Sequence, residues 1–189
     1  MENIFDMIER LCPDGVEYKA LEDCLDYEQP TKYIVKSTDY DNSYETPVLT
    51  AGQSFILGYT DETDGIYKAD KENPVIIFDD FTTSFHWVDF DFKVKSSAMK
   101  MLKPKNNICF RYVFYAMKCI KFQPYSHMRY WISSYSKFEI PFPPIEIQQK
   151  IVNMLDSFTE LIELLNRETE LRQKQYEYYR DKIFDFKRR

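Results

Sequence analysis

Apolar residues in the first half of the chain occur mainly in short runs separated by turn residues. Residues 2–11 show helical spacing, and the turn signal Pro13-Asp14-Gly15 ends that pattern. Residues 16–25 fit either a strand or a short helix. Runs rich in β-branched and aromatic residues then predict short strands at 33–35, 47–50, 55–57, 66–67, 75–78 and 85–92.

The pattern changes in the second half. Apolar spacing predicts a helix over residues 106–122, and residues 136–140 predict a last strand. Three prolines follow at Pro141, Pro143 and Pro144, and only Pro144 suits the start of a helix. We therefore divide the chain into a globular domain, residues 1–143, and a helical unit, residues 144–189.

Residues 145–186 carry a heptad seam without Gly or Pro. Its apolar positions are Ile151, Leu155, Phe158, Ile162, Leu165, Tyr176, Tyr179, Ile183 and Phe186. Thr169 and Arg172 interrupt the seam and favour one register of a partner. Such a helix would be ~60 Å long and would overhang its own domain, so we expect a partner helix. The alternative is a helix folded back along its own domain.

Together these patterns predict an α+β fold, in which a globular domain with a twisted, mostly antiparallel sheet and short helices precedes a long coiled-coil-like helix. The chain has 189 residues, of which 44% are hydrophobic, which suffices for a folded core. Its 4 glycines form no phosphate-binding loop. The cysteines at 12, 24, 109 and 119 lack metal-ligand spacing, so we expect reduced thiols, no metal site and no cofactor.

The start of the chain lacks the basic and apolar regions of a secretory signal, and no apolar run approaches the ~18 residues of a membrane span. We therefore expect a cytoplasmic protein that does not enter a membrane.

Charge is distributed unevenly. The net charge of -6 argues against a nucleic-acid-binding protein when taken alone. However, residues 1–91 hold 21 of the 31 acidic side chains, whereas residues 92–138 hold 10 basic ones and no acidic one. Tyrosines, amides and hydroxyls are interleaved with these cations, which is typical of a surface that binds DNA phosphates and base edges. The alternative is a basic segment that pairs internally with the acidic first half.

A metal-dependent nuclease is a competing hypothesis, because Asp79, Asp91 and Lys93 match a loose arrangement of two carboxylates and a lysine. That pattern is short and common by chance. A methyltransferase would need a glycine-rich cofactor loop and an acidic-Pro-Pro-aromatic motif, and the sequence around Pro143-Pro144 has neither. His86 and His127 are the only imidazoles, and no Ser or Cys lies in a recognisable nucleophile motif, so acid-base and acyl-transfer chemistry are not indicated.

Five segments resemble the DNA specificity (S) subunit of type I restriction-modification systems. They are residues 11–16 (LCPDGV), 47–52 with 58–60 (PVLTAG and GYT), 75–83 (VIIFDDFTT), 95–100 (KSSAMK) and 140–152 (IPFPPIEIQQKIV). Members of that family usually carry two target recognition domains, each followed by a conserved helix, and the helices pack antiparallel. This sequence has one of each, so it resembles half of an S subunit, either a natural short form or a truncated piece.

The resemblance implies a non-catalytic subunit that recognises double-stranded DNA and directs adenine methylation and restriction by partner modification and restriction subunits. AdoMet, Mg²⁺ and ATP would belong to those partners. A helix without an intramolecular partner would pair with a second copy of the chain, and the resulting homodimer would select a palindromic bipartite site. A third hypothesis is a dimerising S-subunit fragment that does not bind DNA by itself.

We select candidate site residues on this basis. The candidate phosphate contacts are Lys93, Lys95, Lys100, Lys103 and Arg129. The candidate base-reading residues are Gln53, Ser54, Thr82, Thr83, Ser84, His86 and Tyr130.

Overall fold

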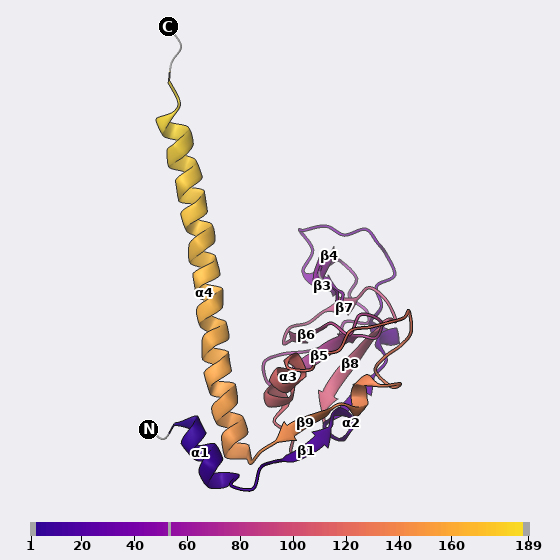
Figure 1. The fold of residues 1–189 in the computed structure, drawn as a ribbon. Helices are drawn as coiled ribbons and strands as arrows, with labels where there is room; N and C mark the ends of the chain where they lie inside the picture. The colour runs from indigo at the N-terminus through magenta and orange to yellow at the C-terminus, as the bar shows by residue number, and fades with distance from the viewer. Residues whose placement is uncertain (1–2, 53, 187–189) are drawn as a thin grey trace.

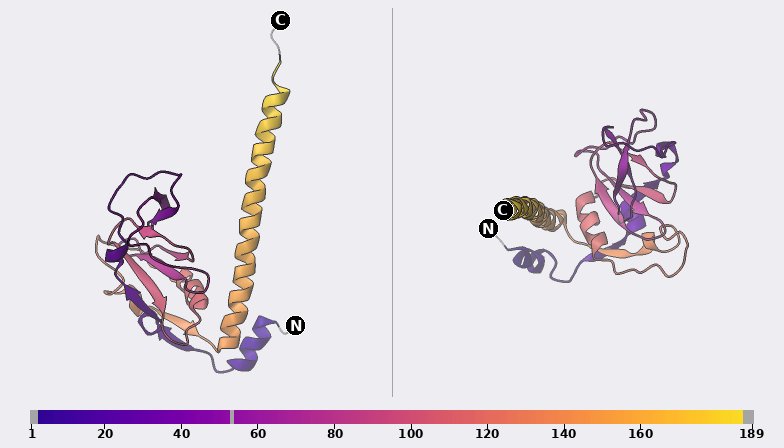
Figure 2. Two further views of the ribbon diagram at one scale, coloured as in Figure 1. Left: turned by 180° about the vertical axis from the view of Figure 1, so that it is seen from behind. Right: turned by 90° about the horizontal axis from the view of Figure 1, so that it is seen from above.

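The computed structural model describes residues 3–52 and 54–186 and contains a globular body beside a long C-terminal helix, α4 (Ile145–Ile183) (Figure 1). The first helix, α1 (Ile4–Leu11), packs against the base of α4. Figures 1 and 2 show that α4 extends well beyond the body and that α1 lies on its outer side, away from the sheets.

The main sheet has four antiparallel strands in the order β2-β8-β5-β6. The strands are β2 (Leu25–Glu28), β5 (Val75–Asp79), β6 (Phe85–Val88) and β8 (Met99–Pro104). Cores cover both faces of β5, because Ile76 and Phe78 face one cluster and Val75 and Ile77 face the other. This two-sided burial explains why β5 is a continuous apolar run rather than an alternating one.

Two smaller sheets flank the main one. One has the order β4-β3-β7, with β3 (Thr46–Leu49) antiparallel to β4 (Ile56–Thr60) and parallel to β7 (Lys93–Val94). The other pairs β1 (Glu17–Ala20) with β9 (Glu139–Phe142). The remaining helices are α2 (Leu21–Cys24), η1 (Pro30–Tyr33), α3 (Phe110–Lys118) and η2 (Tyr135–Lys137).

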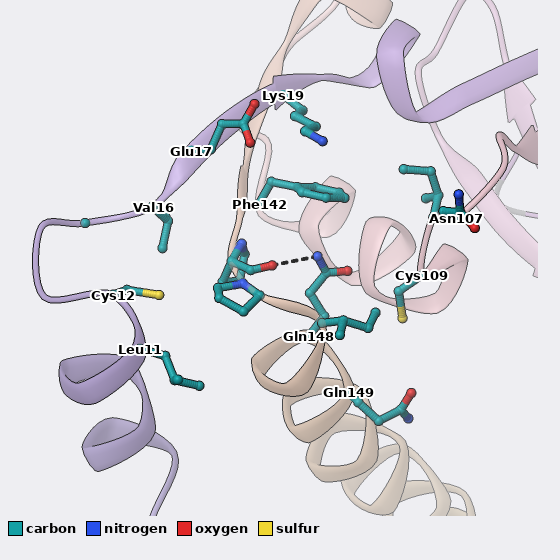
Figure 3. A pocket seen from close by; sticks show the side chains of 15 residues that line it. Leu11, Cys12, Val16, Glu17, Lys19, Asn107, Cys109, Phe142, Gln148 and Gln149 are labelled. Atoms are coloured by element: carbon teal, nitrogen blue, oxygen red, sulfur yellow. Dashed lines mark hydrogen bonds between the residues drawn. The ribbon is translucent and has the colours of Figure 1, made fainter.

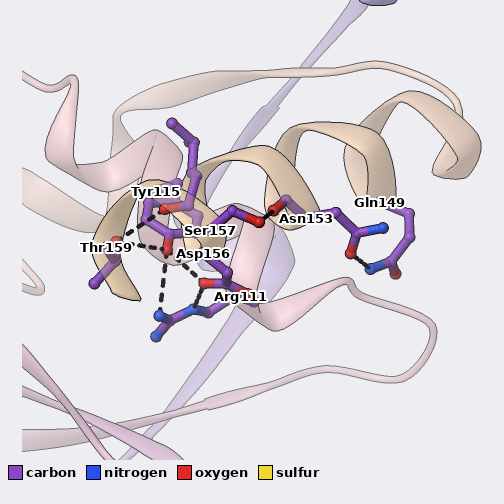
Figure 4. A network of polar contacts seen from close by, with 8 residues as sticks. Arg111, Tyr115, Gln149, Asn153, Asp156, Ser157 and Thr159 are labelled. Carbon is purple, nitrogen blue, oxygen red and sulfur yellow. Dashed lines mark hydrogen bonds and ion pairs between the residues drawn. The ribbon is translucent and has the colours of Figure 1, made fainter. Parts of the chain in front are cut away.

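The lower part of α4 is fixed to the body through α3. Val152 is buried in the larger core, and Ile151 and Leu155 pack against its edge. Beside them, the Arg111 Nε donates to Asp156 Oδ1 at 2.8 Å, and the Tyr115 hydroxyl donates to the same oxygen at 2.5 Å (Figure 4). Burial of Tyr115, followed by its bond to Asp156, raises the pKa of the tyrosine.

Above this attachment α4 is exposed. Of the predicted seam, Phe158, Ile162, Leu165, Tyr176, Tyr179, Ile183 and Phe186 all lie on the surface of the single chain. The first two seam residues, Ile151 and Leu155, instead contact the body. The back-folded alternative therefore holds for the first turns of α4 only.

The α+β class and the long helix are confirmed, with several corrections. The strands form three sheets rather than one. Residues 33–35 do not form a strand: η1 ends at Tyr33, and Ile34 makes an isolated bridge. Strand β8 was not predicted, because Lys100 and Lys103 mask a segment whose first four residues are buried. The helix predicted over 106–122 is shorter, and Asn107 precedes it with φ 61°.

Among the described residues, no helix has both the length and the apolar character needed to cross a membrane.

Candidate nucleic-acid interface

Four segments that are distant in sequence meet at one end of the main sheet. They are the loop after β3, the β5–β6 turn, the loop before β8 and the segment 125–131. The Lys95 amide donates to Leu49 O at 3.0 Å, and the Asp80 amide donates to Ala98 O at 2.9 Å. The Tyr130 amide donates to Asp80 O at 2.8 Å. Backbone hydrogen bonds therefore hold the four segments in one surface, which we call the loop face.

The β5–β6 turn presents hydroxyl groups on the loop face. The Asp79 carboxylate accepts from the amides of Phe81 at 2.8 Å and Thr82 at 2.9 Å, which closes the turn. Thr83 has φ 59°, a conformation that a β-branched residue rarely adopts and that costs about 1–3 kcal/mol. Backbone strain of this size clusters at active sites, ligand-binding sites and switch regions.

Side chains connect this turn to the loop after β3. The Ser84 hydroxyl donates to Ala51 O, and the Thr82 and Ser84 hydroxyls are 2.7 Å apart. His86 Nε2 lies 3.1 Å from Gly52 O, and its ring stacks on Phe55 with centroids 4.6 Å apart. These contacts order a polar surface before any ligand binds.

A buried carboxylate lies beneath the loop face. Asp80 and Lys100 are both 1% exposed, and Asp80 Oδ2 lies 3.1 Å from the Lys100 Nζ. The other carboxylate oxygen, Oδ1, accepts from the Trp131 amide at 2.8 Å. Arg129 Nη1 lies 4.0 Å from Asp80 Oδ2 on the surface side.

A family model described as the type I restriction modification DNA specificity domain matches residues 13–172 of the chain. The chain belongs to this family. It is 49% identical over 198 residues to the EcoR124I/EcoR124II specificity subunit of Escherichia coli, with 99% of this chain and 47% of that protein covered. A shorter match, 32% identical over 89 residues, covers 44% of this chain and 61% of a sequence from Mycoplasma pneumoniae described as the C-terminus of a putative type I specificity subunit.

Solved structures support the same fold. The type I S subunit from M. genitalium superposes with a TM-score of 0.67 at 18% identity, covering 90% of this chain and 46% of that one. A chain from a study of complex assembly and conformational transition of the type I restriction-modification system gives a TM-score of 0.55 at 16% identity, covering 87% and 44%. These three comparisons cover most of this chain. The chain spans about half the length of each of these relatives.

The structure separates the five candidate phosphate contacts. Lys95 and Arg129 belong to the loop face; Lys95 is half-buried with its Nζ 3.3 Å from the Tyr40 hydroxyl, and Arg129 is 50% exposed. Lys103 lies at the opposite end of β8, where its Nζ contacts Glu28 at 3.2 Å. Burial alone would lower the pKa of Lys103, but Tyr67 and Glu28 raise it overall.

The other two candidate cations are internal. Lys93 is 1% exposed, and its Nζ lies 3.0 Å from Glu62 and 2.5 Å from Asp64 O. Lys100 is enclosed with Asp80. Both ammonium groups are buried in ion pairs with carboxylates, so neither is placed to contact a DNA phosphate. Lys93, Lys100, Lys103 and Lys105 all pair with carboxylates of the acidic first half, so the internal-pairing alternative accounts for part of the basic segment.

The candidate base readers are also divided. Thr82 and Ser54 are exposed, Ser84 and His86 are half-buried, and Thr83 is 8% exposed. Tyr130 is 0% exposed, which corrects the expectation that it reaches a base. Its hydroxyl accepts from the Tyr125 and Ser126 amides at 3.0 and 2.8 Å and donates to Ser126 O. Gln53 lies outside the described residues.

Sequence reasoning missed exposed residues beside Arg129. Tyr125 is 78% exposed and Met128 is 36% exposed, and His127 stacks on Phe81 with centroids 4.6 Å apart. Their one sequence signal was the acid-free composition around them.

The three nuclease candidates do not meet. Asp79 ends β5 and is bonded within the turn, whereas Asp91 lies beyond the other end of that strand and pairs with Lys68 at 2.5 Å. Lys93 is enclosed with Glu62. Across the described residues, no group of three His, Cys, Asp or Glu side chains could hold a metal ion. The nuclease hypothesis is therefore not supported.

A separate cleft of about 870 Å³ lies at the base of α4, between the end of α1, strands β1 and β9, and residues 107–109, which precede α3 (Figure 3). Gln148 Nε2 donates to Pro143 O at 2.8 Å there, whereas its buried Oε1 has no hydrogen-bond partner among the described residues. This cleft is formed by different elements from the loop face.

Proposed function

We propose that the chain recognises a specific sequence of double-stranded DNA as part of a type I restriction-modification specificity subunit. The observation that carries the proposal is the loop face, where hydroxyls, an imidazole and two cations converge above a carboxylate neutralised by Lys100. Cations bind phosphates, whereas hydroxyls and imidazole nitrogens can hydrogen-bond base edges.

Phosphate binding is assigned to Lys95 and Arg129. Both are cations of the loop face, and Arg129 has no hydrogen-bonded side-chain partner in the described part of the chain. Base reading is assigned to Ser54, Thr82, Ser84 and His86, which lie on the adjoining loops.

The chemistry is assigned to other subunits. Modification subunits would methylate adenine with AdoMet, and restriction subunits would use Mg²⁺ and ATP to translocate and cleave unmodified DNA in the cytoplasm. This chain would select the site for both, without catalytic residues of its own.

Homodimerisation through the upper part of α4 belongs to the same proposal. Residues 145–170 hold six acidic and two basic side chains, whereas residues 171–183 hold four basic and two acidic ones. Antiparallel pairing would bring the basic end of one helix against the acidic stretch of its copy and cover the exposed seam. Two loop faces related by a dyad would then read a palindromic bipartite site.

Methylation mapping tests the function as a whole. Cells carrying this chain with its modification subunits should show adenine methylation at one palindromic bipartite sequence. Methylation unchanged by deletion of the chain would contradict recognition. An asymmetric site would contradict the homodimer.

Binding of the assembled complex to duplex DNA tests the assigned cations. We expect the double variant Lys95→Ala/Arg129→Ala to weaken binding to all sequences and to lower the salt slope by about one per lost contact. Lys103→Ala is the control, because it removes a cation about as exposed as Arg129 from the other end of β8. Equal salt slopes for the double variant and the wild type would remove the loop face as the DNA surface.

If the complex binds DNA only through its modification subunits and without sequence preference, the chain is instead a dimerising scaffold.

A further inference from the structure

The segment 125–131 has little regular structure, yet two buried side chains hold it in place. The Tyr130 hydroxyl accepts from the Tyr125 and Ser126 amides and donates to Ser126 O, so the side chain of Tyr130 holds the start of the segment. Asp80 then attaches the far end, because its Oδ1 accepts from the Trp131 amide and its backbone oxygen accepts from the Tyr130 amide. The segment is therefore positioned from below, by the residue that follows β5.

Asp80 also joins this segment to the β5–β6 turn. Its neighbour Phe81 stacks on His127 at an interplanar angle of 13°, and the Arg129 guanidinium carbon lies 5.8 Å from the Phe81 ring centre. The turn carries Thr82 and Ser84, which we assign to base reading. A displacement of Asp80 would therefore change the position of the segment 125–131 relative to the β5–β6 turn.

The charges around Asp80 favour an anionic ligand above it. One carboxylate faces two cations, Lys100 at 3.1 Å and Arg129 at 4.0 Å. Lys100 is enclosed, so it neutralises the carboxylate from inside. Arg129 is too far for a hydrogen bond to Asp80, which leaves its positive charge and N–H donors at the surface.

We propose that residues 125–129 form a DNA-reading loop and that Asp80 is the positioning residue that sets its place beside the β5–β6 turn. This inference rests on the proposed DNA recognition. It extends that proposal to a segment, residues 125–129, that none of the five resembling segments includes, and to a buried residue, Asp80, that was not among the candidate site residues. Tyr125 and His127 supply the aromatic and polar groups of the loop, while Asp80 acts through the backbone of Tyr130 and Trp131 and through Arg129.

The test separates positioning from folding with two double variants of the assembled complex. Asp80→Ala/Lys100→Met removes both the buried charges and the acceptor for the Trp131 amide. Asp80→Asn/Lys100→Met removes the charges and keeps that acceptor. Neither leaves an unpaired buried ammonium, which Asp80→Asn alone would do. Each complex selects from a pool of randomised duplexes, and the bound DNA is sequenced; thermal unfolding is recorded in parallel.

We expect the alanine variant to lose roughly tenfold or more of the discrimination at one or two base pairs, about the amount that one good base contact supplies. The asparagine variant should restore most of it, because the Trp131 bond is retained. Glu28→Gln, which alters the exposed Lys103 pair at the other end of β8, should leave the base preference unchanged.

Wild-type discrimination by a folded alanine variant would overturn the role of Asp80. If that variant does not fold, the surface variants Tyr125→Ala and His127→Ala decide, because both residues are exposed; unchanged preference in both would overturn the loop assignment. No preference in the wild-type complex would instead overturn the proposed function, and this inference with it.

Discussion

The two stretches of α4 carry the same heptad pattern but lie in different surroundings. In the lower stretch, Ile151 and Leu155 pack on the body and Val152 is 5% exposed. In the upper stretch, Ile162 is 58% exposed and Leu165 is 53% exposed. A heptad repeat therefore identifies an apolar stripe without specifying whether the protein's own domain or another helix covers it. The length of the helix relative to the domain decides this question.

Substitution in the lower stretch should have the largest effect. We expect Val152→Asp to destabilise the body by on the order of 3 kcal/mol or more, because it buries a charge in the core between α3 and α4. Urea unfolding followed by circular dichroism measures this. Leu164→Asp, at a position 64% exposed and off the seam, is the matched control and should change little. Similar losses in both variants would mean that the upper stretch is also packed on the body.

Substitution in the upper stretch should affect assembly instead. We expect Leu165→Asp to raise the dimer dissociation constant by roughly 100-fold or more, because each dimer contains the change twice. Sedimentation should give a mass of twice 22.8 kDa for the wild type and 22.8 kDa for the variant. At concentrations low enough for the chain to be monomeric, the free energy of unfolding of the globular body should be the same in the variant and the wild type. A monomeric wild type at micromolar concentration would end the homodimer proposal.

The smallest effect concerns the polar attachment of the lower stretch. Tyr115→Phe removes a hydrogen bond to Asp156 and should cost about 1 kcal/mol. Because the pKa of Tyr115 is raised above 10.0, the folded protein holds this proton more tightly than the unfolded chain does. The stability that this group contributes is therefore present below pH 10 and falls as the pH rises above it.

Urea midpoints at about pH 8 and about pH 10.5 measure this dependence. The Phe variant should show a shallower loss across that interval than the wild type. Parallel curves would mean that the hydroxyl does not link α3 to α4.

Local patterns predicted much of this architecture. Strands β3, β5 and β6 follow from β-branched runs, and α4 follows from its seam and from Pro144. The loop after β3 and the β5–β6 turn of the candidate site were also selected from sequence. These features depend on neighbours only a few residues away, so a local sequence pattern is enough to predict them.

The errors concern residues whose environment comes from distant segments. Lys100 looked like a surface cation because its partner, Asp80, is 20 positions earlier, in the turn that follows β5. Lys93 finds Glu62 in the same way. Tyr130 looked like a base reader, yet its hydroxyl organises the adjoining backbone. Composition located the cationic segment, but only the fold separates its buried members from those at the surface.

The pairing of β1 with β9 has a consequence for how the body connects to its helices. Glu17 is opposite Phe142 and Ala20 is opposite Glu139, so the first and last strands of the body are hydrogen-bonded to each other. Everything between the two strands is a closed loop of polypeptide that begins and ends at the same place, next to α1 and α4. A different body joined through the same pair of strands would therefore leave the points where the chain connects to α1 and α4 unchanged.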